Sequence, residues 1–389
     1  MAFRQETDQV EVFHHFDENE QAAMQALVDA LERSNPGIEI DEQLATGVDH
    51  SLQVKTDILN HNPSHIWDVP AGELQPYMDT DVLLDVTDAM EETGFAATID
   101  RMGKEAVTKD GRFYGVPVDI YRINNCFVNE RVAEDIGVDL SRIDGPVAFV
   151  ETMEQLNAER SVTPFPLDLD AWTDPGAVMQ LWTTLLLGVL GPREFRSFVD
   201  GDATRYRSEV EQSLELLRRL DAMETDESSS GGITDDNVLC FHDGDWAAGP
   251  LRDDPEFEFG RDWDLLPFPG TENASLMGLN TLVGSNQTRN DDAIEALLRF
   301  CASREGQRTF NLEKMSIPPR MDMSMEAFHP YIQRQAQYHE RASSYVPAIT
   351  HGAGLTPEQN IELLNAVPSL LSNWDLGQAV TDICAALDD

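Results

Sequence analysis

Apolar positions near the start of the chain recur first with the period of a strand and then with that of a helix. Residues 9–14 alternate between apolar and polar side chains, which predicts a strand. Residues 21–33 place their apolar side chains on one helix face, and Asn35-Pro36-Gly37 ends that helix. A second strand is predicted at residues 38–40. Because this order of elements makes the two strands parallel neighbours, we expect an α/β fold with a parallel sheet.

The same periods predict the elements that follow. Helices are expected at residues 54–59, 147–159, 176–190, 208–223 and 291–303, and strands at residues 64–69, 120–129 and 279–283. Residues 224–232 are rich in Ser, Gly and acidic residues and predict a surface loop. The pair Asp110-Gly111 predicts a tight hairpin, because glycine adopts the positive φ that such a turn needs. Val116-Pro117 then predicts an extended segment, since the residue before a proline is excluded from the helical region.

Length suggests more than one core. A chain of 389 residues suits two domains, and its apolar fraction of 41% is enough for globular packing. No apolar run approaches the roughly 18 residues that span a membrane. Residues 1–6 lack the apolar stretch of an export signal, so we expect either a cytosolic protein or a mature form whose signal has been removed.

The formal net charge of −44 is spread along the whole chain. Nucleic acid is therefore excluded as a partner, because binding it requires clustered Lys and Arg that neutralise phosphates. A folded chain with this charge suits concentrated salt, in which repulsion is screened over about 3 Å at 1 M. Lysine is also scarce, and we expect a halophilic protein; its lysines are Lys55, Lys104, Lys109 and Lys314.

No motif for catalysis or metal binding is present. The cysteines are scattered, which predicts small buried side chains and neither a zinc ribbon nor a disulfide framework; they are Cys126, Cys240, Cys301 and Cys384. His61 and His65 have a metal-ligand spacing, but Pro63 between them argues against a helix and thus against a zinc site. The sequence lacks the nucleophile-elbow, phosphate-loop, dinucleotide and zinc-protease motifs. We therefore expect a protein without catalytic residues, cofactor or metal, and thus not an enzyme.

Several short motifs, in their order along the chain, resemble one family. They are Tyr-Gly-Val-Pro at 114–117, Gly-Asp-Trp-Ala at 244–247, Lys-Met-Ser-Ile-Pro-Pro-Arg at 314–320 and Val-Pro-Ala-Ile-Thr-His-Gly at 346–352. Each is short, but the ordered set runs from about residue 9 to the end. By this resemblance the chain is identified as a member of the periplasmic-type solute-binding proteins of ABC transporters, in the sugar-binding group that includes the glucose- and maltose-binding proteins.

The resemblance implies an α/β periplasmic-binding-protein-like fold of two lobes with three inter-lobe crossings. Lobe 1 is expected to comprise residues 1–116 and 274–313, and lobe 2 residues 117–270 and 320–389. The crossings are expected near residues 114–118, 267–274 and 314–320, with the ligand in the cleft between the lobes.

A sugar site needs aromatic platforms for the apolar ring faces and fixed polar groups for the hydroxyls. The residues that the resemblance places in this role are His15, Phe16, Glu20, Trp67, Asp68, Asp119, Arg122, Asp170, Trp172, Asp245, Trp246, Asn280, Lys314 and His351. Trp246 is the expected aromatic platform. Lys314 is the expected donor, because a compact ammonium offers three hydrogen bonds that a planar guanidinium supplies differently.

Several of these residues have a structural alternative. Phe16 could pack as a hydrophobic staple before the first helix, and Trp67 could belong to the core. Asp119 and Arg122 could pair with each other instead of binding a sugar, and Asp170 and Trp172 could anchor a loop.

The sugar itself is left open, because Pro70 and Asn280 stand where the glucose-binding subgroup usually has His and Asp. The resemblance implies a receptor that delivers a glucose-like monosaccharide or a short oligosaccharide to the permease subunits of an importer. It also implies a monomer on the extracellular face of the membrane, lipid-anchored after removal of an export signal that this sequence lacks. A carbohydrate-processing enzyme and a receptor for a non-sugar solute are the alternatives.

Overall fold

A computed structural model gives the fold, and it describes residues 8–16, 18–45, 49–159, 162–167, 175–223, 232–234, 237–252, 254–288, 291–371 and 373–388. The chain divides into two compact units. Unit 1 comprises Met1–Tyr121 and Gly278–His329, and unit 2 comprises Arg122–Met277 and Pro330–Asp389. The chain therefore passes three times between the units, after Tyr121, Met277 and His329, each point lying beyond the crossing expected from sequence. The exact lobe boundaries stay a prediction.

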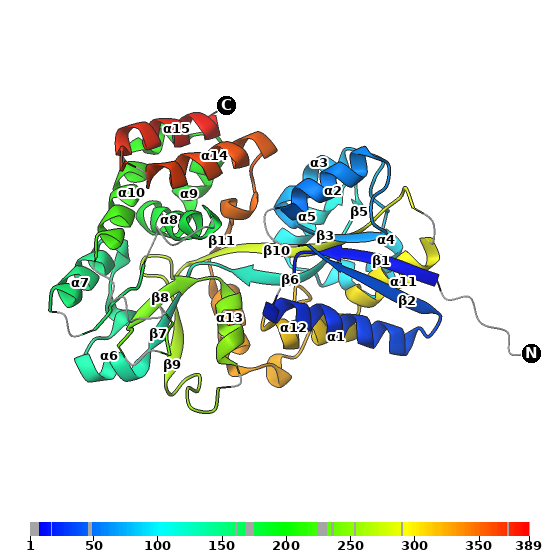
Figure 1. The fold of residues 1–389 in the computed structure, drawn as a ribbon, viewed down its shortest axis with the longest axis horizontal. Coiled ribbons are helices and arrows are strands. Elements are labelled where there is room, and N and C mark those ends of the chain that lie inside the picture. Colours follow the sequence, from blue (N-terminus) through cyan, green and yellow to red (C-terminus); the bar gives the residue numbers. More distant parts are fainter. Residues whose placement is uncertain are drawn as a thin grey trace, which may run out of the picture. The chain divides into compact units, whose positions relative to one another are not determined.

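Unit 1 is a mixed sheet with helices on both of its faces (Figure 1). Its helices are α1 (Glu18–Ser34), α2 (Asp49–Leu59), α3 (Gln75–Met78), α4 (Thr87–Glu92), α5 (Arg101–Val107), α11 (Asp291–Ala302) and α12 (Arg304–Lys314). Its strands are β1 (Asp8–His14), β2 (Ile38–Leu44), β3 (Ile66–Pro70), β4 (Thr108–Lys109) and β5 (Arg112–Phe113), with most of β6 (Val116–Arg122) and β10 (Ala274–Gly284).

The strand order around the sheet of unit 1 agrees with the β-α-β pattern at the start of the chain. β1 pairs in parallel with both β2 and β3, and β10 runs antiparallel to β3. Helices α1 and α12 lie on one side of this sheet, and α2, α3 and α5 lie on the other (Figure 1). The expected parallel pairing of the first strands is confirmed, and the antiparallel β10 makes the sheet mixed. One consequence is that His15, directly after β1, lies beside Asp68 in β3.

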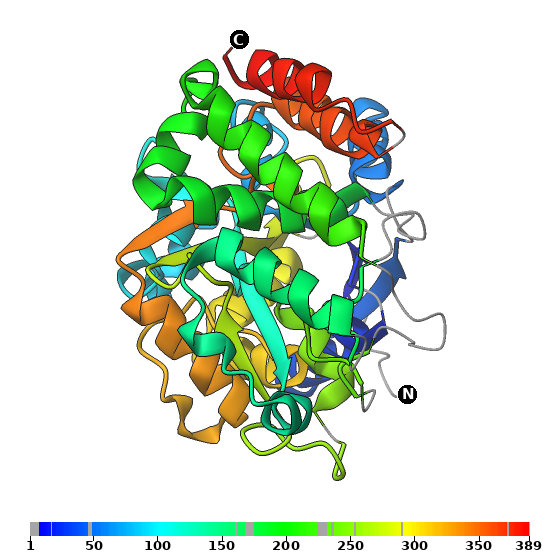
Figure 2. The same ribbon diagram turned by 90° about the vertical axis from the view of Figure 1, so that its left-hand side faces the viewer.

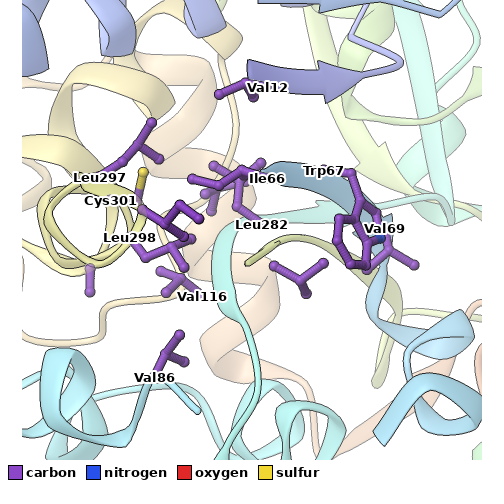
Figure 3. Packing of buried hydrophobic residues seen from close by; sticks show 14 of the residues in the cluster. Val12, Ile66, Trp67, Val69, Val86, Val116, Leu282, Leu297, Leu298 and Cys301 are labelled. Carbon is purple, nitrogen blue, oxygen red and sulfur yellow. The ribbon is translucent and has the colours of Figure 1, made fainter. Parts of the chain in front are cut away.

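The core of unit 1 fills the space between the sheet and its helices. Figure 3 shows Ile66 and Leu282 of the sheet facing Leu297, Leu298 and Cys301 on α11. All of these side chains are buried. The other cysteines are likewise buried and free of disulfides, as their scattered spacing predicted.

The hairpin predicted at Asp110-Gly111 is also present. It joins β4 to β5, and the φ angles of the two residues are 51° and 78°. Two consecutive positive φ angles are typical of the type I′ turn, which matches the right-handed twist of the strands on either side.

Unit 2 is richer in helices. Its strands are β7 (Asn125–Asn129), β8 (Cys240–Asp243), β9 (Trp263–Pro267) and β11 (Ser344–Pro347). Its helices are α6 (Glu130–Ile136), α7 (Gly145–Glu159), α8 (Pro175–Leu190), α9 (Pro192–Val199), α10 (Arg207–Asp221), α13 (Pro330–Arg341), α14 (Pro357–Leu370) and α15 (Leu376–Asp388). β7 lies between β8 and β9 with both pairs antiparallel, and α14 and α15 lie side by side (Figures 1 and 2). Within the described ranges, no helix is both long enough and apolar enough to cross a bilayer.

The single strand predicted at residues 120–129 was wrong. β6 ends at Arg122 and β7 begins at Asn125. The cause is the buried Asn124 side chain, whose amide nitrogen donates to Thr271 Oγ1 at 2.8 Å and whose oxygen accepts from the Leu276 N–H at 3.0 Å. These bonds tie Asn124 to the segment around Thr271 and Leu276, between the end of β6 and the start of β7.

Candidate functional site

Lys314 lies at the centre of a buried charged cluster in unit 1. It is the last residue of α12, and the next residue, Met315, ends the helix in the left-handed conformation. The Lys314 side chain is only 1% exposed, and its ammonium lies 2.5 Å from Asp119 Oδ2 and 3.0 Å from Glu20 Oε1. A cation is also favoured by the partial negative charge at a helix C-terminus. The lysine retained by this lysine-poor chain is therefore held between two carboxylates.

Asp119, on β6, is fixed from its other side by Asn280 on β10. Its Oδ1 accepts from the Asn280 backbone N–H at 2.9 Å, and its Oδ2 accepts from the Asn280 side-chain amide at 3.1 Å. Both residues are buried. A buried carboxylate is tolerated only when it is paired and hydrogen-bonded, and these contacts meet that requirement.

A second cluster joins His15, Asp68 and His50. The carboxylate of Asp68 is fully buried, with one oxygen in direct contact with His15 Nδ1. Its other oxygen accepts from the His15 backbone N–H at 3.0 Å and lies 3.1 Å from His50 Nε2. His15 follows β1, Asp68 lies in β3 and His50 opens α2, so three elements of unit 1 converge on one carboxylate.

The contacts of this cluster set the charge of its members. Burial alone lowers the pKa of His15, but the charge and hydrogen bond of Asp68, with a smaller effect of Glu20, raise it to about 9. Burial alone raises the pKa of Asp68, but the charge and hydrogen bonds of His15 and His50 lower it below its usual range. At neutral pH, His15 is therefore a cation and Asp68 an anion.

Only the outer members of these clusters reach the surface of unit 1. The side chain of His15 is 34% exposed and that of Glu20 is 18% exposed, whereas Asp68, Asp119 and Lys314 are buried. Hydrogen bonds to charged groups are the stronger ones, at about 1.5–3 kcal/mol each. His15 and Glu20 are thus a donor and an acceptor held by buried charges behind them.

Within the part of the chain that the structure describes, His15, His50 and Asp68 also form the group that could hold a metal ion, with one ligand atom each within 4.8 Å of the others. Here the imidazole nitrogens contact the carboxylate oxygens directly.

Two aromatic candidates of unit 1 lie in the interior. Phe16 is fully buried, 5.4 Å from Phe310 between ring centroids, and Trp67 is 1% exposed within the core. Neither offers a ring face to solvent, so their positions favour the packing roles that the sequence left open.

In unit 2, two candidates that are distant in sequence come together. The rings of Trp246 and His351 have centroids 6.1 Å apart, and both side chains are partly exposed. Gly244 permits this arrangement, because a Cβ atom there would lie 2.2 Å from the Trp246 ring. The Gly-Asp-Trp turn therefore supplies the space that the indole occupies.

Arg122 is internal to unit 2. It is fully buried, and its guanidinium donates to Asn125 Oδ1 at 2.8 Å and to Gln335 Oε1 at 3.1 Å. Burial lowers its pKa to about 10, against the opposing effect of the Tyr338, Tyr331 and Asp245 side chains. Residues three apart on a strand point to opposite faces of the sheet. Asp119 therefore pairs with Lys314, whereas Arg122 bonds to Asn125 and Gln335.

Three candidates of unit 2 remain, namely Asp245, Asp170 and Trp172. Asp245 is buried, and its backbone carbonyl accepts from the Tyr331 hydroxyl at 3.0 Å. Asp170 and Trp172 lie outside the described residues.

Comparison with known proteins decides the family. The model of a family described as bacterial extracellular solute-binding protein matches residues 26–348, most of the chain. The chain belongs to this family.

Similar proteins come from varied organisms. The xylose/arabinose-binding protein XacG of Haloferax volcanii is 27% identical over 90% of this chain and 78% of its own length. An uncharacterized ABC transporter extracellular-binding protein of Pyrococcus horikoshii is 23% identical over 98% of this chain and 88% of its own. A structure solved in a study of xylan utilization by Caldanaerobius polysaccharolyticus superimposes with a TM-score of 0.81 at 16% identity, covering 97% of this chain and 99% of that one. The two-lobe periplasmic-binding-protein fold with three crossings is thereby confirmed.

Sequence reasoning missed His50 in this solute-binding protein. No periodic pattern in the sequence points to this residue, and its contact with Asp68 comes only from the approach of α2 to β3. A histidine at the first turn of a helix is too common a feature to have been singled out.

Proposed function

We propose that this solute-binding protein is the receptor of an ABC importer for a sugar, either a glucose-like monosaccharide or a short oligosaccharide. The observation that carries the proposal is the charged constellation of unit 1, in which buried Lys314 and Asp68 fix the partly exposed Glu20 and His15. These two groups are suited to hydroxyls, which both donate and accept hydrogen bonds.

The paired charges also argue for a neutral ligand. Lys314 and His15 are offset by Asp119, Glu20 and Asp68, so the cluster has no unpaired cation for an anionic solute. A sugar meets these constraints, because it binds through hydroxyls and carries no charge.

Trp246 and His351 supply the apolar complement in unit 2. A pyranose presents flat CH faces, and an indole is the side chain best suited to pack on them. We assign Trp246 as this platform and His351 as its polar neighbour.

The similar proteins support the class of ligand. XacG is named for xylose and arabinose, and the structure from Caldanaerobius polysaccharolyticus was solved in work on xylan utilization. The family description supports an extracellular location, and we propose that permease subunits are the partners. The acidic surface, together with the haloarchaeal relative, supports a protein adapted to high salt.

A thermal-shift screen in molar salt tests the proposal. The probes are D-glucose, D-xylose, L-arabinose, maltose, cellobiose and xylobiose, and a sugar at 100 times its Kd adds about 2.7 kcal/mol of stability. We expect at least one sugar to raise the Tm without being converted to product. Absence of any shift across the panel, or release of products from a disaccharide, would contradict a sugar receptor.

A further inference from the structure

The carboxylate of Asp68 has no exposed surface from which to contact a ligand. It is fully buried, and both of its oxygens are in contact with the protein, through the His15 ring, the His15 backbone N–H and the His50 ring. A carboxylate in this state cannot meet a sugar hydroxyl directly. Its effect on a ligand has to pass through His15, which is one third exposed.

His50 is held as firmly as Asp68. Its ring stacks on Phe13 with centroids 4.9 Å apart and an angle of 24°, and its centroid lies 5.3 Å from that of His15. The residue is 6% exposed. His50 therefore contacts the carboxylate oxygen that also accepts from the His15 backbone N–H, and it has little surface of its own for a ligand.

We propose that His50 and Asp68 are positioning residues that fix His15 as an obligate hydrogen-bond donor to the sugar, while Lys314 fixes Glu20 as the matching acceptor. This proposal rests on the proposed function. Unit 1 then binds a sugar through two of its groups. One sugar oxygen accepts a hydrogen bond from His15, and one sugar hydroxyl donates a hydrogen bond to Glu20. A neutral histidine could either donate or accept a hydrogen bond, whereas a protonated histidine only donates. Fewer arrangements of sugar hydroxyls therefore fit the protonated form.

The groups that face His15 come from four elements. They are Asp68 on β3, His50 on α2, Glu20 on α1 and Lys314 on α12. Since Nδ1 contacts Asp68, Nε2 is the nitrogen left for a ligand. The pKa of His15, raised to about 9, keeps a proton on both nitrogens throughout the neutral range.

The first test needs no sugar. NMR of the histidine ring resonances, assigned by comparison with His15→Gln, should show His15 titrating near pH 9 in the wild type. In Asp68→Asn the His15 pKa should fall below its ordinary value of about 6.5, because burial then acts without the carboxylate charge. A wild-type His15 that titrates near 6.5, or one that Asp68→Asn leaves unchanged, would overturn the proposal.

The second test measures sugar binding by calorimetry in molar salt, with D-glucose and D-xylose as probes. We expect His50→Ala to weaken binding about tenfold and His50→Gln to restore it, because the glutamine amide still donates to Asp68. His61→Asn is the matched control, since His61 is exposed in a left-handed turn that asparagine tolerates. Equal losses in His50→Ala and His50→Gln, or no loss in either, would overturn the positioning role.

The two tests separate the two proposals. If neither sugar binds the wild type while His15 still titrates near pH 9, the choice of ligand fails and the charge assignment of His15 stands. Micromolar Zn²⁺ is the remaining probe. If it raises the wild-type Tm and His50→Ala abolishes the rise, a metal occupies the place of the protons, and the donor role of His15 is overturned.

Discussion

The two charged clusters of unit 1 and the buried Arg122 of unit 2 are stabilised in different ways. In the two clusters each buried charge meets an opposite one, with Lys314 against Asp119 and His15 against Asp68. In unit 2 the buried guanidinium of Arg122 is bonded to the amide oxygens of neutral side chains. Each cluster of unit 1 includes one partly exposed side chain, His15 or Glu20, whereas Arg122 has no exposed surface. Under the proposed function, we therefore expect the clusters of unit 1 to direct hydrogen bonds to the ligand, and we expect Arg122 to contribute to the stability of unit 2.

The largest expected effect comes from breaking the central pair of unit 1. Lys314→Met leaves Asp119 buried without its cation, which should cost about 3–5 kcal/mol of unfolding free energy. Denaturant unfolding in molar salt measures this loss. Lys109→Met is the matched control, because Lys109 pairs with Asp79 at the surface, and such pairs contribute about 0–1 kcal/mol. Similar losses of unfolding free energy in the two variants would show that the buried pair of Lys314 stabilises the protein no more than a surface pair does.

A smaller loss is expected on the unit 2 side of the comparison. Arg122→Met leaves the buried oxygens of Asn125 and Gln335 without their donor. Because both groups are neutral, we expect the low end of about 1–3 kcal/mol for each, which is about 2 kcal/mol in all. The same unfolding experiment measures the loss, and calorimetry on the folded variant should return the wild-type sugar affinity. If the variant lost sugar affinity while its unfolding free energy stayed unchanged, Arg122 would be a ligand-binding residue and this interpretation would be wrong.

The aromatic pair of unit 2 can be disturbed through its glycine. Gly244→Ala places a Cβ atom 2.2 Å from the Trp246 ring, and overpacking of this kind costs about 1–3 kcal/mol. Sugar affinity should fall with stability, because the indole has to move. Gly37→Ala is the control, since a Cβ there meets nothing within 4 Å. A Gly244→Ala variant with full sugar affinity would remove Trp246 from the site.

The smallest effect is a pH dependence of stability confined to unit 1. The folded-state pKa of His15 is raised to about 9, so its contribution is fully present below pH 6.5 and lost as pH rises through 9. The difference in unfolding free energy between the wild type and His15→Gln should shrink over this interval. A difference that stays constant from pH 6 to pH 10 would show that folding does not raise the pKa of His15.

Local patterns predicted much of the fold. The alternation at residues 9–14, the helix that follows and the Asp110-Gly111 turn were all recovered, because each depends on neighbours in sequence. The break at Asn124 was missed, since it depends on contacts with Thr271 and Leu276 far along the chain.

The candidate site was predictable only in outline. The ordered motifs predicted His15, Glu20 and Lys314 as site residues, and the structure places them in two neighbouring clusters of unit 1. The sequence did not say which member of each cluster is exposed. Burial of Phe16 and Asp68, and the approach of His50, result from packing between elements that no local pattern encodes.

Calorimetric titration in molar salt, using the sugar with the largest thermal shift, tests the sugar-receptor assignment most directly. The wild type should show one saturable site, and His15→Ala and Trp246→Ala should each weaken it about 10- to 100-fold. That range follows from about 1.5–3 kcal/mol for a hydrogen bond to a charged group and a comparable value for a buried aromatic face. Wild-type affinity in both variants would contradict a sugar site built from these residues.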